Sequence, residues 1–242
     1  MVTSNSMVSA VGVKGSGSKM EQRSRATRAR IVRAAHELFC DRGFRATTMQ
    51  EIGRAAGVSV QTVYFQFRTK DEVLKAVHEW TVLGDEGLPP QTQPWHRAAL
   101  EEPDVRVAVA KLAAGIATLN VRVAPTLPIF ATLEQEPGGD IYRRSRTLRR
   151  EGMEELATAL KAKAPLRSGM TTTRAADLLD FLLGPESYAE LVLRAGWSRR
   201  RWVNWVSETL ADQLFGTPNS TEILTHSERT DHDGVSAGGI DD

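Results

Sequence analysis

The sequence predicts an all-α protein with a small three-helix head at the N-terminus and a larger helical body behind it. Apolar residues recur at helical spacing through most of residues 25–216, and the body carries no strand signal. In the head, short helical segments are opened by capping residues and separated by Gly57, a pattern typical of a helix-turn-helix unit. With 242 residues, the chain is long enough for such a head and for a body with its own core.

The overall composition favours a cytoplasmic protein. Hydrophobic residues make up 41% and charged residues 25% of the chain, and we expect no apolar run near the roughly twenty residues of a membrane helix. Residues 1–22 are polar and rich in Gly and Ser, so we expect a disordered leader rather than a secretory signal. Cys40 is the only cysteine, which excludes an internal disulfide, and it fits a small core residue better than a redox sensor.

The first helix is expected to run from about Arg25 to Arg42 and to end at Gly43. Its apolar face holds, at helical spacing, Ile31, Ala34, Ala35, Leu38 and Phe39. This face lets the helix support the helix-turn-helix. Ahead of it, Arg23 and Arg25 either form a flexible basic arm that reaches phosphate or carry solvated charge.

Two short helices and a tight turn follow the first helix. Thr48 is a good N-cap, and Glu51 completes a capping box. Gly57 ends that helix because glycine readily adopts the left-handed conformation of a helix C-terminus. Ser59 then caps a second short helix, expected at Val60–Phe65. Helix, turn and helix together predict a helix-turn-helix unit.

A further helix opens at Thr69, with Glu72 at the capping-box position, and is expected to extend from Lys70 to about Leu83. The next segment, GDEGLPPQTQP, breaks every helical pattern. The chain is therefore expected to divide into a head at 23–83, a linker at 84–94 and a body at 95–216.

Short capped helix pairs also occur in all-α proteins that do not bind DNA, so the charge distribution matters. From Lys19 to Lys70 the chain holds eleven Lys or Arg residues against four Asp or Glu, whereas the net charge of the whole chain is only +1. Basic charge is therefore concentrated where the motif lies, which favours nucleic-acid binding.

The head also carries specific motifs. T-x-x-R-I-x-x-A-A-x-x-L-F spans Thr27 to Phe39, and D-R-G-F-x-A-T-T spans Asp41 to Thr48. A-A-G-V-S and T-V-Y-x-x-F follow, and the match as a whole runs to Leu74 without a gap. These motifs resemble the N-terminal domain of the TetR family of bacterial transcriptional regulators.

The resemblance implies that the second motif helix enters the major groove of DNA. The residues it assigns to DNA binding are Thr47, Thr48, Ser59, Val60, Gln61, Thr62, Tyr64, Phe65 and Lys70. Among these, Val60, Gln61 and Thr62 would face base edges with Phe65 nearby, and the paired threonines, Tyr64 and Lys70 would bind phosphate. The chemistry agrees, since glutamine can pair with adenine while hydroxyl and ammonium groups suit phosphate oxygens.

Three positions depart from the usual family pattern. Gln61 stands where glycine is common, Gln66 where histidine or tyrosine is common, and Gly53 where alanine is usual. The first two leave the bases that are read open. Gly53 still allows close packing, at about 1 kcal/mol of helix propensity.

The body is expected to contain helical segments at about 105–123, 129–133, 138–164, 173–183 and 198–215, with the fourth resuming after a break at Gly184–Pro185 and continuing to Arg194. In the last segment the apolar residues cover more than one face, so the helix must bury against a second partner besides its own domain. G-P-E-S-Y and R-A-G-W-S resemble, more loosely, the C-terminal region of TetR relatives, where the last two long helices form a four-helix dimer interface. The expected interface residues are Leu178, Leu182, Trp202, Trp205, Val206 and Leu210.

The resemblance also implies an effector that binds in the body, moves helix four and changes the separation of two heads. Apolar and aromatic residues line small-molecule sites, although each candidate here also fits a plain core position. The candidates are Trp80, Trp95, Leu112, Ile116, Phe130, Tyr142 and Phe181. Because none is charged, we expect an apolar or amphipathic effector. The basic face Arg143–Arg150 is interpreted as solvated, with an anionic effector or an extra DNA contact as the alternative.

The sequence therefore predicts a homodimeric, sequence-specific DNA-binding regulator, a repressor released from a near-palindromic operator by a small molecule. A DNA-binding protein of the same fold without a ligand is the alternative. An enzyme is disfavoured because the five histidines are scattered, with no metal-ligand spacing, Gly-rich phosphate loop or G-x-S-x-G motif, so no cofactor or metal is expected. Residues 217–242 are acidic and polar and should form a disordered tail.

Overall fold

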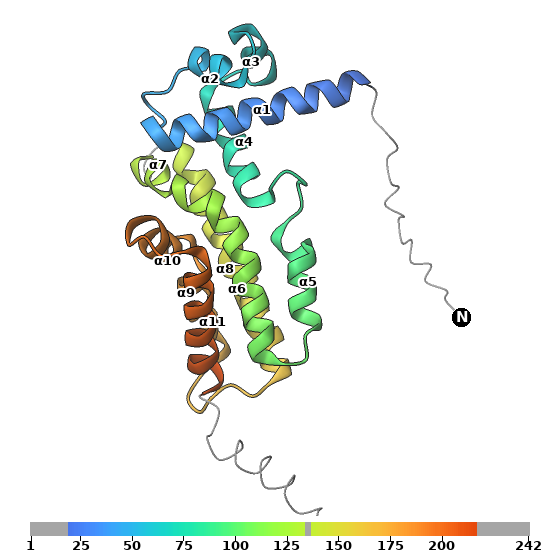
Figure 1. The fold of residues 1–242 in the computed structure, drawn as a ribbon, viewed down its shortest axis with the longest axis vertical. Helices are drawn as coiled ribbons and strands as arrows, with labels where there is room; N and C mark the ends of the chain where they lie inside the picture. Colours follow the sequence, from blue (N-terminus) through green and yellow to red (C-terminus); the bar gives the residue numbers. More distant parts are fainter. Residues whose placement is uncertain (1–18, 134–136, 217–242) are drawn as a thin grey trace, which may run out of the picture. The chain divides into compact units, whose positions relative to one another are not determined.

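The computed structural model describes residues 19–133 and 137–216, without the side chains of residues 137 and 138. Every regular element in these ranges is helical, which confirms the predicted fold class (Figure 1). Contacts divide the chain into one unit of Met1–Gly87 with Pro128–Gly139 and a second of Leu88–Leu127 with Asp140–Asp242. The expected tail at 217–242 and most of the expected leader lie outside the described residues.

The first unit is built around four helices, α1 (Lys19–Arg42), α2 (Met49–Ala56), α3 (Val60–Gln66) and α4 (Lys70–Leu83). Their shared core holds the fully buried side chains Ile31, Phe39, Ile52, Val63, Phe67 and Leu74. The helix starts and ends agree with the predicted caps at Thr48, Gly57, Ser59 and Thr69. The start of α1 does not agree, because the helix begins at Lys19 rather than Arg25 and so includes the last residues of the expected leader.

Most of α7 (Leu127–Thr132) also belongs to the first unit, although the sequence placed this segment in the body. Pro125 and Pro128 end the preceding helix, since proline cannot continue its hydrogen-bond pattern. Phe130 is buried, and its ring meets the ring of His78 on α4 edge-on at 5.1 Å. Burial lowers the pKa of His78 to about 4, so this imidazole is neutral at physiological pH.

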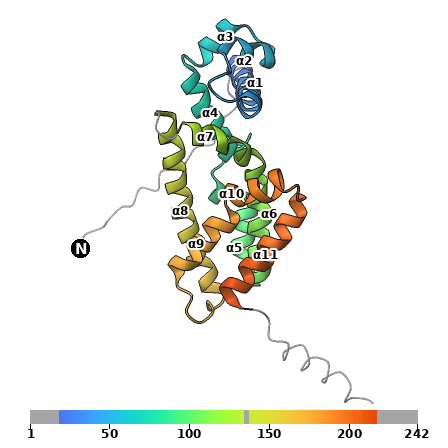
Figure 2. The same ribbon diagram turned by 90° about the vertical axis from the view of Figure 1, so that its left-hand side faces the viewer.

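The second unit contains the remaining helices, which can be followed in Figure 2. They are η1 (Pro90–Thr92), α5 (Pro94–Glu101), α6 (Val105–Val123), η2 (Ala124–Thr126), α8 (Pro137–Lys163), α9 (Thr172–Leu183), α10 (Pro185–Tyr188), the π-helix η3 (Ala189–Arg194) and α11 (Arg199–Phe215). One hydrophobic core joins buried side chains of α5, α6, α8, α9 and α11. The sequence did not predict α5, because the proline and glutamine residues at 89–94, just before and at its start, are typical of a loop.

The stretch Val105–Thr132 is long and apolar enough by composition to cross a membrane, contrary to the expectation from sequence. Half of its most apolar 18-residue window is buried inside the protein. Ala108, Leu112 and Ile116 of α6 belong to the core of the second unit. The hydropathy of α6 is therefore that of a helix at the centre of a packed body.

The side chain of Trp95 on α5 packs against Gly115 of α6. A Cβ atom added to this residue would lie only 2.2 Å from Cδ2 of Trp95 and 2.6 Å from its Cγ. The indole ring of Trp95 thus lies directly over the backbone of α6, and only glycine leaves room for it. By contrast, a Cβ atom at Gly152 of α8 would meet no atom within 4 Å.

These two glycines give a matched pair of substitutions. Gly115→Ala should lower the free energy of unfolding by about 1–3 kcal/mol because Trp95 must shift out of a packed position. Gly152→Ala should raise it by roughly 0.5–1 kcal/mol because alanine is the better helix former and finds open space. Urea unfolding followed by circular dichroism measures both. Equal stability of the Gly115→Ala variant and the wild type would contradict the close approach of α5 and α6.

Candidate nucleic-acid interface

Helix α3 has one buried side and one side open to solvent. Val63 of α3 is 0% exposed, and Phe67, the C-cap residue of the helix, is 1% exposed. Both side chains fix the helix in the core of the first unit. Tyr64 is 52% and Phe65 85% exposed, and Gln61 is also exposed. An aromatic side chain held in water on a fixed helix indicates a contact surface rather than a core position.

The turn before α3 holds the helix by backbone geometry. Gly57 adopts φ 66° and ψ 39°, the left-handed conformation that closes α2. The Ser59 hydroxyl accepts a hydrogen bond from the backbone N–H of Thr62 at 3.2 Å, so Ser59 serves as the N-cap. A Cβ atom at Gly53 would lie 3.1 Å from the carbonyl oxygen of Val58, so glycine in place of the usual alanine lets the turn lie tightly against α2.

Both threonines expected at phosphate make hydrogen bonds within the head, Thr47 from a buried position and Thr48 from an exposed one. Thr47 is 1% exposed, and its hydroxyl donates to the carbonyl of Gly43 at 2.9 Å. The Thr48 hydroxyl accepts from the Glu51 N–H at 3.2 Å and donates to the Glu51 carboxylate at 2.8 Å. The backbone N–H of Thr48 also donates to the Glu51 carboxylate, at 2.9 Å, and this bond together with the one from the hydroxyl lowers the pKa of Glu51. The structure thus gives both hydroxyls a structural role, because the loop before α2 needs them to satisfy its own polar groups.

Lys70 also differs from the role that the resemblance implies. Its ammonium donates to the carbonyl oxygens of Phe44 at 2.8 Å, Thr47 at 3.0 Å and Arg45 at 3.3 Å. The same Nζ lies 4.5 Å from the centre of the Phe44 ring. An ammonium group has three N–H donors, so these carbonyls use all of them. Lys70 closes the loop between α1 and α2, a role that the sequence pattern did not reveal.

Two exposed arginines that the sequence motifs did not identify supply positive charge near the helix-turn-helix. Arg54 lies on α2, and Arg68 lies between α3 and α4. The carboxylate of Glu72 accepts from the backbone N–H of Arg68 at 2.9 Å, instead of from Thr69 as in an ideal capping box. Guanidinium groups at the ends of the motif helices suit phosphate oxygens. The signal in the sequence was the surplus of basic residues, which did not distinguish one arginine from another.

Comparison with known proteins agrees with this geometry. Residues 31–77 match the family model described as bacterial regulatory proteins, tetR family. The chain is 33% identical to the HTH-type transcriptional regulator UidR of Escherichia coli over 58 residues, which are 24% of this chain and 30% of UidR. It is 47% identical to the HTH-type transcriptional regulator SrpR of Pseudomonas putida over 51 residues, 21% of this chain and 24% of SrpR. Residues 31–77 therefore form a TetR-family head. The family comprises DNA-binding transcriptional regulators rather than enzymes.

The matches to UidR and SrpR are short, and the chain spans less than a third of either protein. Solved structures extend the likeness of fold further. A putative TetR-family regulator from Mesorhizobium loti gives a TM-score of 0.60 at 20% identity, covering 80% of this chain and 98% of that one. NalD of Pseudomonas aeruginosa gives 0.58 at 23% identity, covering 79% and 98%. At such identities the likeness concerns the fold, and it extends into the body of this chain.

The seven residues expected to line an effector pocket have different environments. Trp80 and Phe130 belong to the first unit and the other five to the second. Leu112 and Ile116 are buried in the core, and Trp95 packs on Gly115. Phe181 is 69% exposed, so its side chain lies on the surface of α9 rather than in an internal site.

Tyr142 is part of an ionic cluster that joins α8 to α9 and α10. Its hydroxyl donates to Glu186 at 2.9 Å, and burial together with the Glu186 charge raises the Tyr142 pKa. Arg149 binds Glu186 with both terminal nitrogens, at 3.0 and 3.3 Å, and its Nε lies 2.8 Å from Asp180. Burial alone would raise the pKa of Glu186, but Arg149 lowers it. Arg149, on the basic face of α8, therefore joins this helix to α9 and α10 instead of carrying solvated charge.

Four of the expected dimer residues lie in the chain's own core. Trp202, Val206 and Leu210 are 0% exposed and Leu182 is 7% exposed. Trp202, Val206 and Leu210 are four residues apart on α11, so they form a single stripe on one side of the helix. The second apolar face that the sequence predicted for this helix is therefore reduced mainly to Trp205. Trp205 is 37% exposed, and Leu178 is partly buried against the core.

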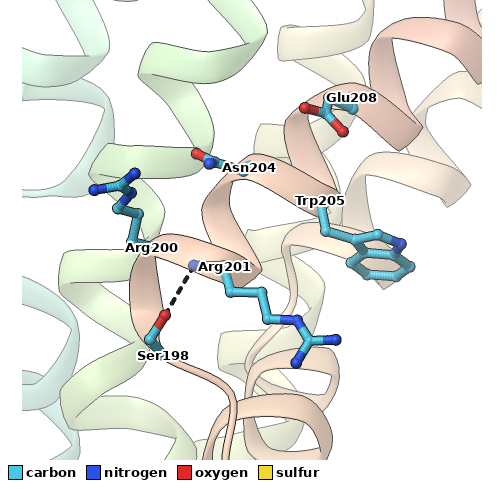
Figure 3. Close-up of a pocket in the computed structure, with 6 residues that line it drawn as sticks. All are labelled: Ser198, Arg200, Arg201, Asn204, Trp205 and Glu208. Atoms are coloured by element: carbon cyan, nitrogen blue, oxygen red, sulfur yellow. Dashed lines mark hydrogen bonds between the residues drawn. The ribbon is translucent and has the colours of Figure 1, made fainter.

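The outer side of α11 carries an open depression around Trp205 (Figure 3). Its lining residues are Ser198, Arg200, Arg201, Asn204, Trp205 and Glu208. The Trp205 ring meets that of Trp197 edge-on at 5.8 Å, and the Arg201 guanidinium lies 4.0 Å from the centre of the Trp197 ring. Tryptophan and arginine held in this way are typical of protein–protein contact surfaces.

Lys70 can be tested against a second lysine of the same helix. Lys70→Met keeps the aliphatic stem but leaves three carbonyls without a donor, so we expect a loss of about 1–3 kcal/mol in unfolding free energy. Lys75→Met, at an exposed position of α4, should leave stability within about 0.5 kcal/mol of wild type. Denaturant unfolding of both variants gives the comparison. Unchanged stability for Lys70→Met, together with a weaker salt dependence of DNA binding, would restore the phosphate role.

Proposed function

We propose that this protein is a sequence-specific DNA-binding repressor of transcription, of the TetR family, that works in the bacterial cytoplasm. The observation that carries the proposal is the exposed face of α3, where Gln61, Tyr64 and Phe65 project from a helix fixed by Val63 and Phe67. A helix fits the major groove of B-form DNA, and its exposed side chains then meet base edges.

The side chains of this face divide by chemistry. Gln61 can donate to and accept from adenine, whereas Val60 and Phe65 can contact the methyl group of thymine. The Tyr64 hydroxyl suits phosphate, which carries no sequence information. Thr62 contributes less, because its hydroxyl lies 2.9 Å from that of Ser59 within the cap. We therefore assign the main base reading to Gln61 and Phe65.

Repression is supported by the similarity of fold to known repressors. NalD is described as the secondary repressor of a multidrug efflux pump, and SmeT of Stenotrophomonas maltophilia as the repressor of another. For this chain the proposed effector is a small apolar or amphipathic molecule, because Leu112 and Ile116, the candidates buried in the second unit, are apolar. Release requires an element whose conformation the effector changes.

The segment η2–α7 is the proposed link between effector and head. It follows α6 directly in the chain, yet Phe130 of α7 packs on His78 of α4 in the first unit. The Nδ1 atom of His78 is buried without a hydrogen-bond partner among the described residues. Such an atom destabilises its surroundings, so the α4–α7 contact is a place where a modest input can shift the balance between two conformations.

We also propose that the protein acts as a homodimer through α9 and α11 on a near-palindromic operator. Phe181 is exposed on α9, and Trp205 of α11 lines the arginine-containing depression of Figure 3. Exposed aromatic residues together with arginine favour association with another protein surface. Two heads would then read half-sites about 34–36 Å apart or more.

The alternative is a DNA-binding protein of the same fold that responds to no ligand. Titration of the protein–operator complex with apolar and amphipathic compounds separates the two. A compound that lowers operator affinity by roughly 5- to 150-fold has the usual strength of allosteric coupling and supports the repressor with an effector. A broad compound set without any such shift supports the alternative.

The reading of DNA is tested by two substitutions on α3. Gln61→Ala should cost about 1–3 kcal/mol on the native operator and much less on random DNA, because a base contact is lost. Tyr64→Phe should weaken both DNAs about equally, because a phosphate contact is lost. The ratio of specific to non-specific affinity, measured at several salt concentrations, distinguishes the two roles. If the ratio is unchanged in Gln61→Ala, base reading passes to Val60, Thr62 and Phe65.

The dimer is tested by adding charge to the proposed interface. Phe181→Glu with Trp205→Glu should shift the protein from dimer to monomer at micromolar concentration, because buried unpaired carboxylates oppose association. Val107→Glu is the control, since Val107 is an exposed apolar residue of α6, at 44% exposure, outside the proposed surface. Light scattering gives the mass of each variant. A monomeric wild-type protein would disprove the dimer.

A further inference from the structure

The first two turns of α1 form a helix that the core of the head does not require. Helix α1 has 24 residues, but every side chain from Lys19 to Ala26 is exposed, and the first buried one is Ile31. Apolar burial therefore does not fix these turns against the rest of the head. Any contact that fixes them must be polar.

Polar contacts to the end of α3 provide that anchor. The side-chain amide of Gln66 donates to the Ser24 hydroxyl at 3.1 Å. Arg28 donates to the carbonyl oxygen of Gln66 at 3.2 Å, and its guanidinium lies 4.1 Å from the centre of the buried Phe67 ring. The start of α1 is thus fastened to the same helix that carries Gln61, Tyr64 and Phe65.

Gln66 acquires a specific role from this contact. It stands where related heads commonly have histidine or tyrosine, and the sequence alone left open whether it reads a base. In the structure it is only partly exposed, and its amide is directed to α1. The contact explains the departure from the family pattern as a bridge between α1 and α3.

The anchored turns carry positive charge without partners. Lys19, Arg23 and Arg25 are exposed, and none of them has a hydrogen bond or ion pair to another described residue. Successive helix residues lie about 100° apart around the axis, so Arg23 and Arg25 flank Ser24 on both sides. Because Ser24 faces α3, the two guanidinium groups stand to either side of the α1–α3 contact.

We propose that the N-terminal turns of α1 form a second DNA-contact element, in which Arg23 and Arg25 bind phosphates beside the groove occupied by α3. The inference rests on the proposed DNA-binding function and deepens it. Phosphate is the fitting partner because a guanidinium group binds it with two parallel hydrogen bonds. Ser24, Gln66 and Arg28 are positioning residues, which hold the basic turns in a fixed place instead of leaving a flexible arm.

The test uses the full chain and measures affinity for operator and for random DNA across a range of salt concentrations. Arg23→Gln with Arg25→Gln should weaken both DNAs by a similar factor, on the order of tenfold at physiological salt, and flatten the salt dependence by about 0.9 per lost contact. The control, Lys161→Gln with Arg167→Gln, removes the same charge from exposed positions of the second unit and should change little.

A further variant tests the anchor without altering charge. Ser24→Ala removes the acceptor of the Gln66 amide and should lower affinity for both DNAs a few-fold. Wild-type affinity in Ser24→Ala would overturn the anchored geometry. Wild-type affinity and salt dependence in the Arg23 and Arg25 variant would overturn the phosphate contact. A loss confined to the operator would also overturn it, since that pattern belongs to base reading.

These failures are distinct from a failure of the proposed function. If the wild-type protein binds the operator and Gln61→Ala changes the specificity ratio, the function stands whatever the α1 variants do. If the wild-type protein binds no DNA, both proposals fail together.

Discussion

A seven-residue helix is too short to be stable in water, and the reading of DNA by this protein depends on such a helix. The first unit is organised around that constraint. Val63 and Phe67 fix α3 from below, Ser59 caps its start, and the left-handed Gly57 sets its approach from α2. Because these contacts use the buried side and the two ends, the outer side remains free to carry Gln61, Tyr64 and Phe65. Phe65 can remain exposed because the buried side chains of Val63 and Phe67 hold the helix in place.

Several polar side chains that the sequence suggested as ligand contacts instead make hydrogen bonds or ion pairs within the fold. Lys70 donates to three backbone carbonyls, and Thr47 and Thr48 satisfy the loop before α2. In the body, Arg149 neutralises Asp180 and Glu186 between helices. Partly buried polar groups must find partners, so the residues that remain for a nucleic acid are those at exposed positions. The basic residues at the start of α1 and around the motif helices meet that condition.

The division of the chain into units gives the proposed regulation a physical route. Helix α7 follows α6 and η2 in sequence, yet Phe130 packs on His78 in the first unit. A change in the body can therefore act on α4 through a covalently continuous segment. The unpartnered Nδ1 of His78 keeps this contact from being fully stabilised, which suits a switch better than a rigid joint.

The sequence by itself determined the helical fold class, the caps at Thr48, Gly57, Ser59 and Thr69, and the family of the head, because these follow from local hydrogen bonding and spacing. It also led to the proposal that residues of α3 read bases. Tertiary structure alone decided how the other polar and apolar side chains are used. Periodicity could not show that the stripe of Trp202, Val206 and Leu210 packs in the chain's own core, that α7 joins the first unit, or that Lys70 turns inward. It could not show that Gln66 fastens Ser24 to the end of α3. Each of these depends on which distant segment packs beside the residue, and a local pattern carries no information about that neighbour.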